Sequence, residues 1–221
     1  MSDFYHRQIE LWGEQTQQNL KNKKVAIIGC GGLGCSLGLT LGSSGIGEFY
    51  LVDFDKVEIH NIHRQLGFSK DDIGKYKCEA LKNTLEKRSL DTAFNSFTIS
   101  FEEFTKLDIE VDLILDATDN LPTRKAIDEY AKKTSTPWIY ASVEEFNGQV
   151  CFFEKSSFST FNIQNKTPKG ITPPIVSFIA SLQANFALRY LADLTVKKDT
   201  LYYLYINNEG EFITQKFRMP S

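Results

Sequence analysis

Short apolar runs alternate with helix-patterned stretches along most of this chain. Helical spacing of apolar residues predicts helices over 33–44, 75–88 and 121–133. The apolar runs that predict strands fall at residues 25–28, 49–52, 97–99, 111–115, 138–141 and 150–153. Strands that alternate with helices are typical of a doubly wound, Rossmann-like α/β fold with a mainly parallel sheet. The run at 111–115 is mostly apolar, as expected for a strand buried on both faces.

The pattern changes after residue 153. Residues 156–174 are mostly polar and include three prolines, which predicts a long loop. A helix over 175–191 and an antiparallel hairpin with strands at 201–206 and 212–217 complete the prediction. We expect a single domain over 1–221, with an N-terminal helical arm at 1–22, a core at 23–154, a crossover loop at 155–174, and a C-terminal helix and hairpin at 175–221.

Composition and charge exclude several classes of protein. Hydrophobic residues make up 42% of the 221 residues and charged residues 24%, as in an ordinary soluble globular protein. The net charge of −3 provides no global field that would recruit nucleic acid or anionic lipid. The N-terminus lacks a basic start followed by an apolar core, and the helix over 175–191 carries too many polar residues for a membrane span. A cytoplasmic protein that binds neither nucleic acid nor membrane is expected.

The four cysteines carry no metal-binding or disulfide pattern. Cys30, Cys35, Cys78 and Cys151 include no C-x-x-C pair. The spacing therefore argues against both a disulfide framework and a zinc site, and no zinc is expected.

Clustered glycines end the first apolar run. Gly29, Gly31, Gly32 and Gly34 form a G-x-G-x-x-G pattern, and nineteen residues after Gly34 the second run ends in Asp53. Glycines let main-chain N–H groups approach phosphates closely, and a carboxylate at the next strand end can hold a ribose hydroxyl. The pattern predicts a nucleotide site, but it suits hydride transfer as well as ATP chemistry.

The polar residues that follow favour phosphate chemistry. A nucleotidyl-transfer enzyme needs fixed cations for a triphosphate and a carboxylate for magnesium. Arg64 and Lys77 are candidate cations, and Lys77 falls in the first turn of a predicted helix. Asp119 follows the run at 111–115, at the strand end where such sheets bind ligands. It could hold magnesium or simply cap the helix that begins near residue 121.

Taken together, these segments resemble the ThiF/MoeB/HesA family, the bacterial relatives of ubiquitin-activating enzymes. The resemblance runs in the family's order and spacing over nearly the whole chain. The matching motifs are Tyr5-x-Arg7-Gln8, Gly29-x-Gly31-Gly32-Leu33-Gly34, Asp53-Phe54-Asp55, Asn61-x-x-Arg64-Gln65, Gly74-x-x-Lys77, Ala117-Thr118-Asp119-Asn120, Gly148-Gln149-Val150 and Ser181-Leu182-Gln183-Ala184.

The resemblance implies an ATP- and Mg²⁺-dependent adenylyltransferase. Its substrate would be the C-terminal glycine of a small ubiquitin-like sulfur carrier ending in Gly-Gly, in thiamine or molybdopterin biosynthesis, with a separate sulfur donor. It also implies a homodimer, with Arg7 supplied across the interface as an arginine finger. The nucleotide-binding residues implied in this way are Gly29, Gly31, Gly32, Gly34, Asp53 (ribose), Asp55, Asn61, Arg64, Gln65, Lys77, Asp119 (magnesium) and Asn120.

The chain departs from the family at two points. Many members carry two C-x-x-C pairs that bind structural zinc, and here aromatic packing by Phe152, Phe153, Phe158, Phe161 and Tyr202 is expected to stabilise the loop and hairpin instead. Thiamine-pathway relatives also carry a crossover-loop cysteine that links covalently to the carrier. Lys166 falls at about that position, so adenylation without a covalent enzyme–carrier link is expected.

Other functions stay open at this point. The chain could adenylate another acyl group, such as a peptide or tRNA-linked carboxylate, or it could be a non-catalytic subunit that binds a ubiquitin-like protein. A nicotinamide dehydrogenase would leave the residues from Asn61 to Gln65 and the Asp119 motif unexplained.

Overall fold

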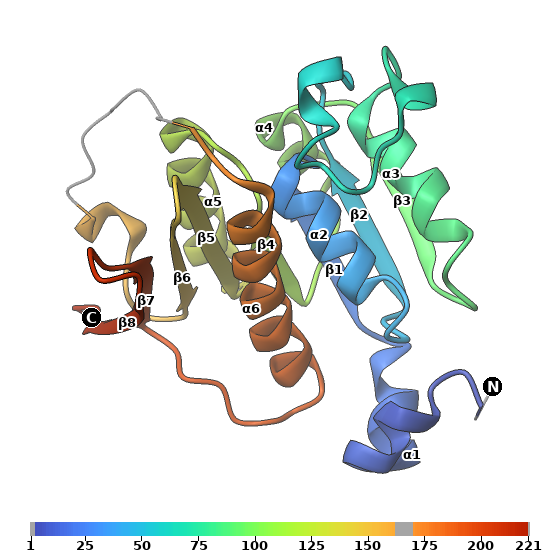
Figure 1. The fold of residues 1–221 in the computed structure, drawn as a ribbon. Coiled ribbons are helices and arrows are strands. Elements are labelled where there is room, and N and C mark those ends of the chain that lie inside the picture. The colour runs from blue at the N-terminus through green and yellow to red at the C-terminus, as the bar shows by residue number, and fades with distance from the viewer. Residues whose placement is uncertain (1–2, 162–169, 221) are drawn as a thin grey trace.

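An eight-stranded sheet forms the centre of the protein (Figure 1). The structure is a computed structural model that describes residues 3–161 and 170–220. The strand order is β3-β2-β1-β4-β5-β6-β7-β8, in which β1 to β5 are parallel and β6 to β8 run antiparallel. The strands are β1 (Lys24–Ile28), β2 (Glu48–Val52), β3 (Ala93–Phe97), β4 (Leu113–Asp116), β5 (Trp138–Glu144), β6 (Asn147–Phe153), β7 (Thr200–Ile206) and β8 (Phe212–Arg218). The doubly wound fold with a C-terminal hairpin is confirmed.

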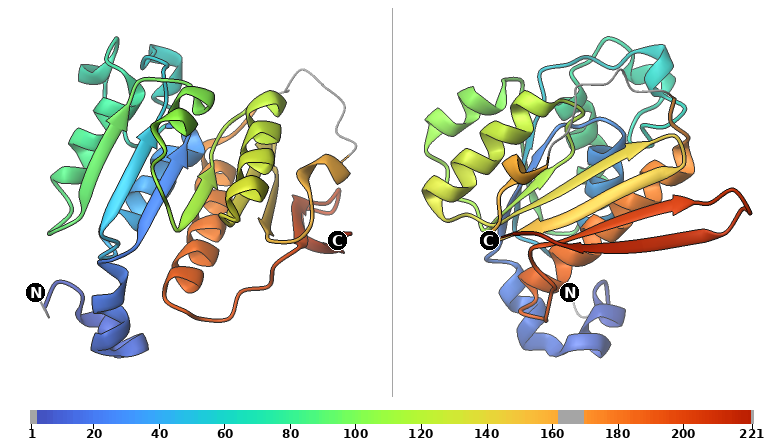
Figure 2. Two further views of the ribbon diagram at one scale, coloured as in Figure 1. Left: turned by 180° about the vertical axis from the view of Figure 1, so that it is seen from behind. Right: turned by 90° about the vertical axis from the view of Figure 1, so that its left-hand side faces the viewer.

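Helices cover both faces of the sheet (Figures 1 and 2). Alternate residues of β1 divide between two cores: Val25 and Ile27 pack under α2, α3 and α6, and Ala26 and Ile28 pack against α4 and α5. This alternation explains why β1 reads as a continuous apolar run. The helices are α1 (His6–Leu20), α2 (Gly32–Leu41), α3 (Lys77–Glu86), α4 (Phe101–Phe104), α5 (Leu121–Thr134) and α6 (Pro173–Leu191).

The N-terminal helix α1 lies beyond the amino end of β1, away from the carboxyl ends of the strands (Figure 1). It is bent at Gly13, whose φ of 84° departs from helical geometry. The fully buried Leu20 joins α1 to the core, and Gln17 Nε2 donates to the Ser44 carbonyl oxygen over 2.9 Å. Arg7 is an exposed residue of α1, the helix that lies at the opposite end of the sheet from the carboxyl ends of the strands.

Several element boundaries differ from the sequence prediction, and three of them have a clear cause or consequence. The strand predicted at 97–99 is β3, which ends at Phe97, because residues 93–97 pair with β2. The strand predicted at 111–115 is β4, which begins two residues later. The helix predicted from 175 begins at Pro173, since proline suits the first helical position, where no N–H donor is required.

Aromatic packing stabilises the C-terminal half, as expected. Trp138 stacks on Phe153 with ring centroids 4.7 Å apart, and Phe158 packs edge-on against Phe161 at 5.3 Å. Across the other face, Phe186 contacts Tyr202 at 5.3 Å. These rings join the start of the crossover loop and the hairpin to β5 and α6. Over residues 3–161 and 170–220, no helix has both the length and the hydropathy needed to cross a membrane.

Candidate active site

The predicted nucleotide residues gather where the strand order reverses. β1 lies between β2 and β4, so the connections that follow β1 lead to one side of the sheet and those after β4 lead to the other. Ligands bind at such a switch point, outside the carboxyl ends of the strands. Three turns meet here: the glycine turn after β1, the Asp53 turn after β2 and the Asp119 turn after β4 (Figure 1).

The glycine turn is packed too closely for side chains. Gly29 has a φ of 91°, and a Cβ there would lie 2.7 Å from the Ala117 carbonyl oxygen. A Cβ on Gly34 would overlap the Gly29 carbonyl oxygen, because the first turn of α2 rests directly on the glycine turn. Gly32 faces Val176 of α6 in the same way. The glycines therefore bring α2, α6 and the Asp119 turn together around one short loop.

Asp53 holds the glycine turn in place. Its Oδ2 accepts the Cys30 N–H over 2.6 Å and its Oδ1 accepts the Asp55 N–H over 2.8 Å. The side chain lies at the site's edge, and the residue is only 9% exposed. Burial raises the pKa of Asp53, against these hydrogen bonds and the charge of Lys77. Each carboxylate oxygen keeps a further lone pair, so the residue remains suited to accept a ribose hydroxyl.

The buried Lys77 forms an ion pair with the exposed side chain of Asp55. Lys77 Nζ lies 2.7 Å from Asp55 Oδ2, and the Lys77 N–H donates to the Asp55 carbonyl oxygen over 2.9 Å. The lysine is the first residue of α3 and is 8% exposed, whereas the Asp55 side chain is 56% exposed. The N-terminal end of α3 adds a partial positive charge beside this pair, which suits phosphate.

The segment from Asn61 to Gln65 lies against the glycine turn. Asn61 is buried, and its Oδ1 accepts the Glu58 N–H over 2.9 Å. The Gln65 Nε2 would be 3.6 Å from a Cβ on Gly31, and its Oε1 has no hydrogen-bond partner among the described residues. Arg64 Nη1 donates to the His60 carbonyl oxygen over 3.0 Å. The structure thus brings Gln65 to the turn and leaves the Arg64 side chain on local contacts.

Asp119 is exposed after β4, and Asn120 rather than Asp119 caps the next helix. Asn120 Oδ1 accepts the Thr123 N–H over 2.9 Å at the start of α5. Asp119 makes no hydrogen bond or ion pair with the residues that the structure describes. No group of three or more His, Cys, Asp or Glu residues in the described chain could hold a metal. A single free carboxylate fits magnesium that takes its other ligands from nucleotide phosphates and water.

Arg7 is a predicted residue that is not part of this gathering. Arg7 Nη1 lies 3.0 Å from Glu10 Oε2 on α1, at the far end of the sheet. Within one chain it does not reach the glycine turn, so its predicted role requires a second copy. Lys166 lies outside the described residues.

Burial and raised thiol pKa values argue against a nucleophilic role for the cysteines near the site. Cys30, Cys35 and Cys78 are buried. Burial raises the pKa of the Cys35 thiol to about 12 and that of Cys78 to about 11, and it raises the pKa of Cys30 as well. The three thiols therefore stay protonated at neutral pH, and they serve as packing beneath the glycine turn.

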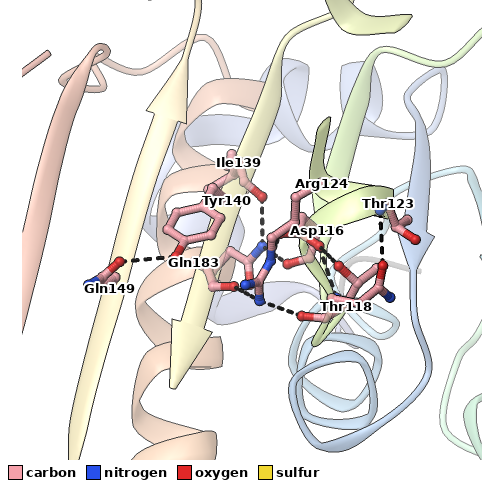
Figure 3. Close-up of polar contacts among 10 residues, drawn as sticks. Asp116, Thr118, Thr123, Arg124, Ile139, Tyr140, Gln149 and Gln183 are labelled. Carbon is pink, nitrogen blue, oxygen red and sulfur yellow. Dashed lines mark hydrogen bonds and ion pairs between the residues drawn. The ribbon is translucent and has the colours of Figure 1, made fainter. Parts of the chain in front are cut away.

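Sequence reasoning missed a buried polar network behind Asp119 (Figure 3). Asp116, the fully buried last residue of β4, pairs with Arg124 of α5 over 3.2 Å. Gln183 of α6 donates its Nε2 to the main-chain oxygens of Asp116 and Ile139, each over 2.9 Å. One signal was present: Arg124 shares helical spacing with Ile127 and Ala131, so a charge stands on the apolar face of α5.

A comparison with protein-family models matches the description "ThiF family" over residues 5–221. The chain belongs to the ThiF family. The shared fold extends to a solved structure of Escherichia coli MccB with MccA-N7isoASN, which superposes with a TM-score of 0.85 at 22% identity. That match covers 100% of this chain and 75% of the MccB chain.

Curated relatives of this ThiF-family chain are adenylyltransferases. It is 28% identical over 231 residues to the adenylyltransferase and sulfurtransferase MOCS3 of Caenorhabditis briggsae, a match covering 97% of this chain and 57% of that protein. It is 31% identical over 202 residues to the molybdopterin-synthase adenylyltransferase of Escherichia coli, covering 85% of this chain and 81% of that protein. The chain spans about half the length of the MOCS3 relatives that it matches.

Proposed function

We propose that this protein adenylates the C-terminal glycine of a ubiquitin-like sulfur carrier, with ATP and Mg²⁺, in thiamine or molybdopterin cofactor biosynthesis. One observation carries the proposal: a glycine turn, the Lys77–Asp55 pair and the exposed Asp119 carboxylate meet at the switch point of the sheet. Family membership and the adenylyltransferase names of the relatives support the same activity. A sulfur donor separate from this chain would then act on the adenylated carrier.

The reaction needs positioning and charge stabilisation more than acid–base catalysis. The attacking carboxylate of the carrier is already ionised at neutral pH, so no general base is required. Main-chain N–H groups of the glycine turn and Lys77 would hold the phosphates, with Asn61, Arg64 and Gln65 alongside, and Asp53 would hold the ribose. Asp119, with Asn120 beside it, would hold a magnesium ion that neutralises charge on the departing pyrophosphate.

A homodimer would complete the site. Arg7 belongs to α1, which lies away from the carboxyl ends of the strands (Figure 1), so the Arg7 of a second copy would have to serve as the arginine finger. The protein would act in the cytoplasm, without zinc.

Carrier-dependent exchange of pyrophosphate into ATP tests this function. The wild-type protein is expected to exchange label only when a carrier ending in Gly-Gly and Mg²⁺ are both present, and Asp119→Ala is expected to abolish the exchange. Glu129→Ala, which removes an exposed carboxylate from α5 outside the site, is the matched control. Wild-type protein that is inactive with both thiamine-type and molybdopterin-type carriers would refute the proposal, and exchange supported by a free peptide would favour the alternative acyl substrate.

The same assay tests the phosphate contacts. Arg64→Ala and Lys77→Ala are each expected to reduce exchange at fixed carrier concentration, because each removes a fixed cation. Unchanged exchange in either variant would show that the corresponding contact is assigned wrongly.

A further inference from the structure

The Asp119 side chain has no contact of its own that fixes its direction. It is exposed and without partners among the described residues, so its position follows from the backbone of the turn at Thr118 and Asn120. Asn120 is held from one side by the Thr123 N–H. The other side of the turn depends on groups buried beneath the sheet's carboxyl edge.

We propose that Arg124 and Gln183 are positioning residues that fix the Asp119 carboxylate toward the magnesium–phosphate site, acting through the buried Asp116 and the Thr118 backbone. This inference rests on the proposed function for its catalytic consequence. The geometry of the turn stands apart from that function and is tested separately.

Arg124 joins three segments at one point. Its Nε lies 3.2 Å from Asp116 Oδ2, and its Nη2 donates to the carbonyl oxygens of Thr118 over 2.6 Å and Ala141 over 3.3 Å. Its guanidinium carbon stands 5.1 Å from the ring centroid of Tyr140 (Figure 3). Only the planar guanidinium, with its several fixed donors, can make these contacts together. A lysine at this position would keep the positive charge but would lack the several donors that the guanidinium holds in one plane.

Asp116 transmits this geometry to Thr118. Its Oδ1 accepts both the N–H of Thr118, over 2.9 Å, and the Thr118 hydroxyl, over 2.6 Å. Thr118 is thus held at its N–H, its hydroxyl and its carbonyl oxygen by one ion pair. Because hydrogen bonds to charged groups are among the stronger ones in proteins, the residue immediately before Asp119 is rigidly placed.

Gln183 bonds the main chain of Asp116 from the opposite face of the sheet. Its side chain is fully buried in α6, and the two carbonyl oxygens that it bonds belong to adjacent strands, β4 and β5. It therefore holds the end of β4 in register with β5 just where the Asp119 turn begins. A buried ion pair often adds little to the free energy of folding. The Asp116–Arg124 pair matters here because it holds the atoms of the Asp119 turn in one geometry.

Hydrogen–deuterium exchange on the nucleotide-free chain tests the geometry directly. In Arg124→Lys, the amides of Ala117 and Thr118, which donate to the Ile28 carbonyl oxygen and to Asp116 Oδ1, are expected to exchange about tenfold faster, because the Asp116 carboxylate loses its guanidinium partner. The matched control is Lys132→Gln, which breaks the Lys132–Asp128 pair on the same helix and is expected to leave those amides unchanged. Gln183→Leu, outside the ion pair, is the second variant and is expected to accelerate the same amides.

A second experiment, which measures activity, tests whether Arg124 affects the reaction through Asp119. In carrier-dependent exchange, Arg124→Lys is expected to raise the Mg²⁺ concentration for half-maximal rate about tenfold. In an Asp119→Asn background, the same substitution is expected to change the affinity for a non-hydrolysable ATP analogue with Mg²⁺, measured by calorimetry, less than about twofold, because residues that act as a unit are not additive.

The outcomes separate the inference from the proposed function. Unchanged amide exchange in Arg124→Lys, or fully additive losses with Asp119→Asn, would overturn the positioning role. Wild-type protein without carrier-dependent exchange would overturn the proposed function, while the amide measurements would still decide how the turn is held.

Discussion

Replacing Gly34 by alanine tests the physical basis of the glycine turn. The added Cβ would overlap the Gly29 carbonyl oxygen and lie 2.9 Å from the Gly29 carbonyl carbon. Both are main-chain atoms and cannot rotate away, so α2 must separate from the turn. Overpacking of this kind costs about 1–3 kcal/mol. Because the overlap is with main-chain atoms, the upper end of this range applies, and a net loss of about 2 kcal/mol remains after alanine regains up to about 1 kcal/mol in helix propensity.

That loss has two measurable consequences. For a domain of this size, each kcal/mol lowers Tm by about 2–4 °C, so Gly34→Ala is expected to melt about 4–8 °C below wild type. The shift also disturbs the Cys30 N–H that Asp53 accepts over 2.6 Å, and ATP affinity is expected to fall at least about tenfold. Circular dichroism melting measures the first quantity, and calorimetric titration with a non-hydrolysable ATP analogue measures the second.

Gly38 offers a control in the same helix, about one turn further along. A Cβ there would meet Leu85 Cδ1 at 3.0 Å, the far end of a flexible side chain. Gly38→Ala is therefore expected to stay within about 2 °C of wild type, since helix propensity offsets the tight contact. If Gly34→Ala behaved like Gly38→Ala in both assays, the close approach of α2 to the turn would not be what requires glycine.

Three further predictions follow from other contacts. Lys77→Met is expected to weaken ATP analogue binding about tenfold or more, measured by calorimetry, and unchanged affinity would contradict the phosphate role. An equal mixture of Arg7→Ala and Asp119→Ala chains is expected to recover about a quarter of wild-type exchange, because half the dimers carry one intact site; no recovery would contradict a shared site. Burial raises the pKa of Asp199, but hydrogen bonds from the Ser156 hydroxyl and three main-chain N–H groups lower it by more than burial raises it. The pKa of Asp199 in the folded protein therefore lies below its ordinary value. Its stabilisation is present above the ordinary pKa of about 3.9 and is lost as pH falls below it, so the urea stability gap between wild type and Asp199→Asn should shrink below about pH 4; a constant gap would contradict this.

The sheet and the glycine turn were predictable because their signals are local. A buried parallel strand such as β1 must be apolar on both faces, and the glycines mark the tight turn that follows it. The predicted position of β3 was wrong by several residues because β3 is an edge strand with Asn95 and Ser96 in its middle. An edge strand that is partly exposed to solvent does not need a continuous apolar run. Its true partner is set by register with β2, which lies far away in sequence.

The candidate site was predictable in its residue types but not in its pairings. The sequence indicated Asp53 by its spacing from the glycine turn and Lys77 by its place in the first turn of a predicted helix. It did not indicate that Lys77 is paired with Asp55, or that Asp116 is buried with Arg124, because those contacts depend on how α3 and α5 pack. Gln183 lies 67 residues from Asp116 in the sequence. A single polar residue in an apolar helix does not indicate which distant group it hydrogen-bonds.

The Lys77–Asp55 pair has a consequence for selectivity. Because the lysine is already neutralised at 2.7 Å, an anion must compete with a carboxylate rather than occupy a vacant positive charge. A free phosphate ion would be held only at the phosphate position, so it would gain little by displacing the Asp55 carboxylate from Lys77. A nucleotide triphosphate held simultaneously at its ribose, its phosphates and its metal binds through several contacts at once, and those contacts together offset the displaced carboxylate. The pair therefore favours the whole nucleotide over its fragments.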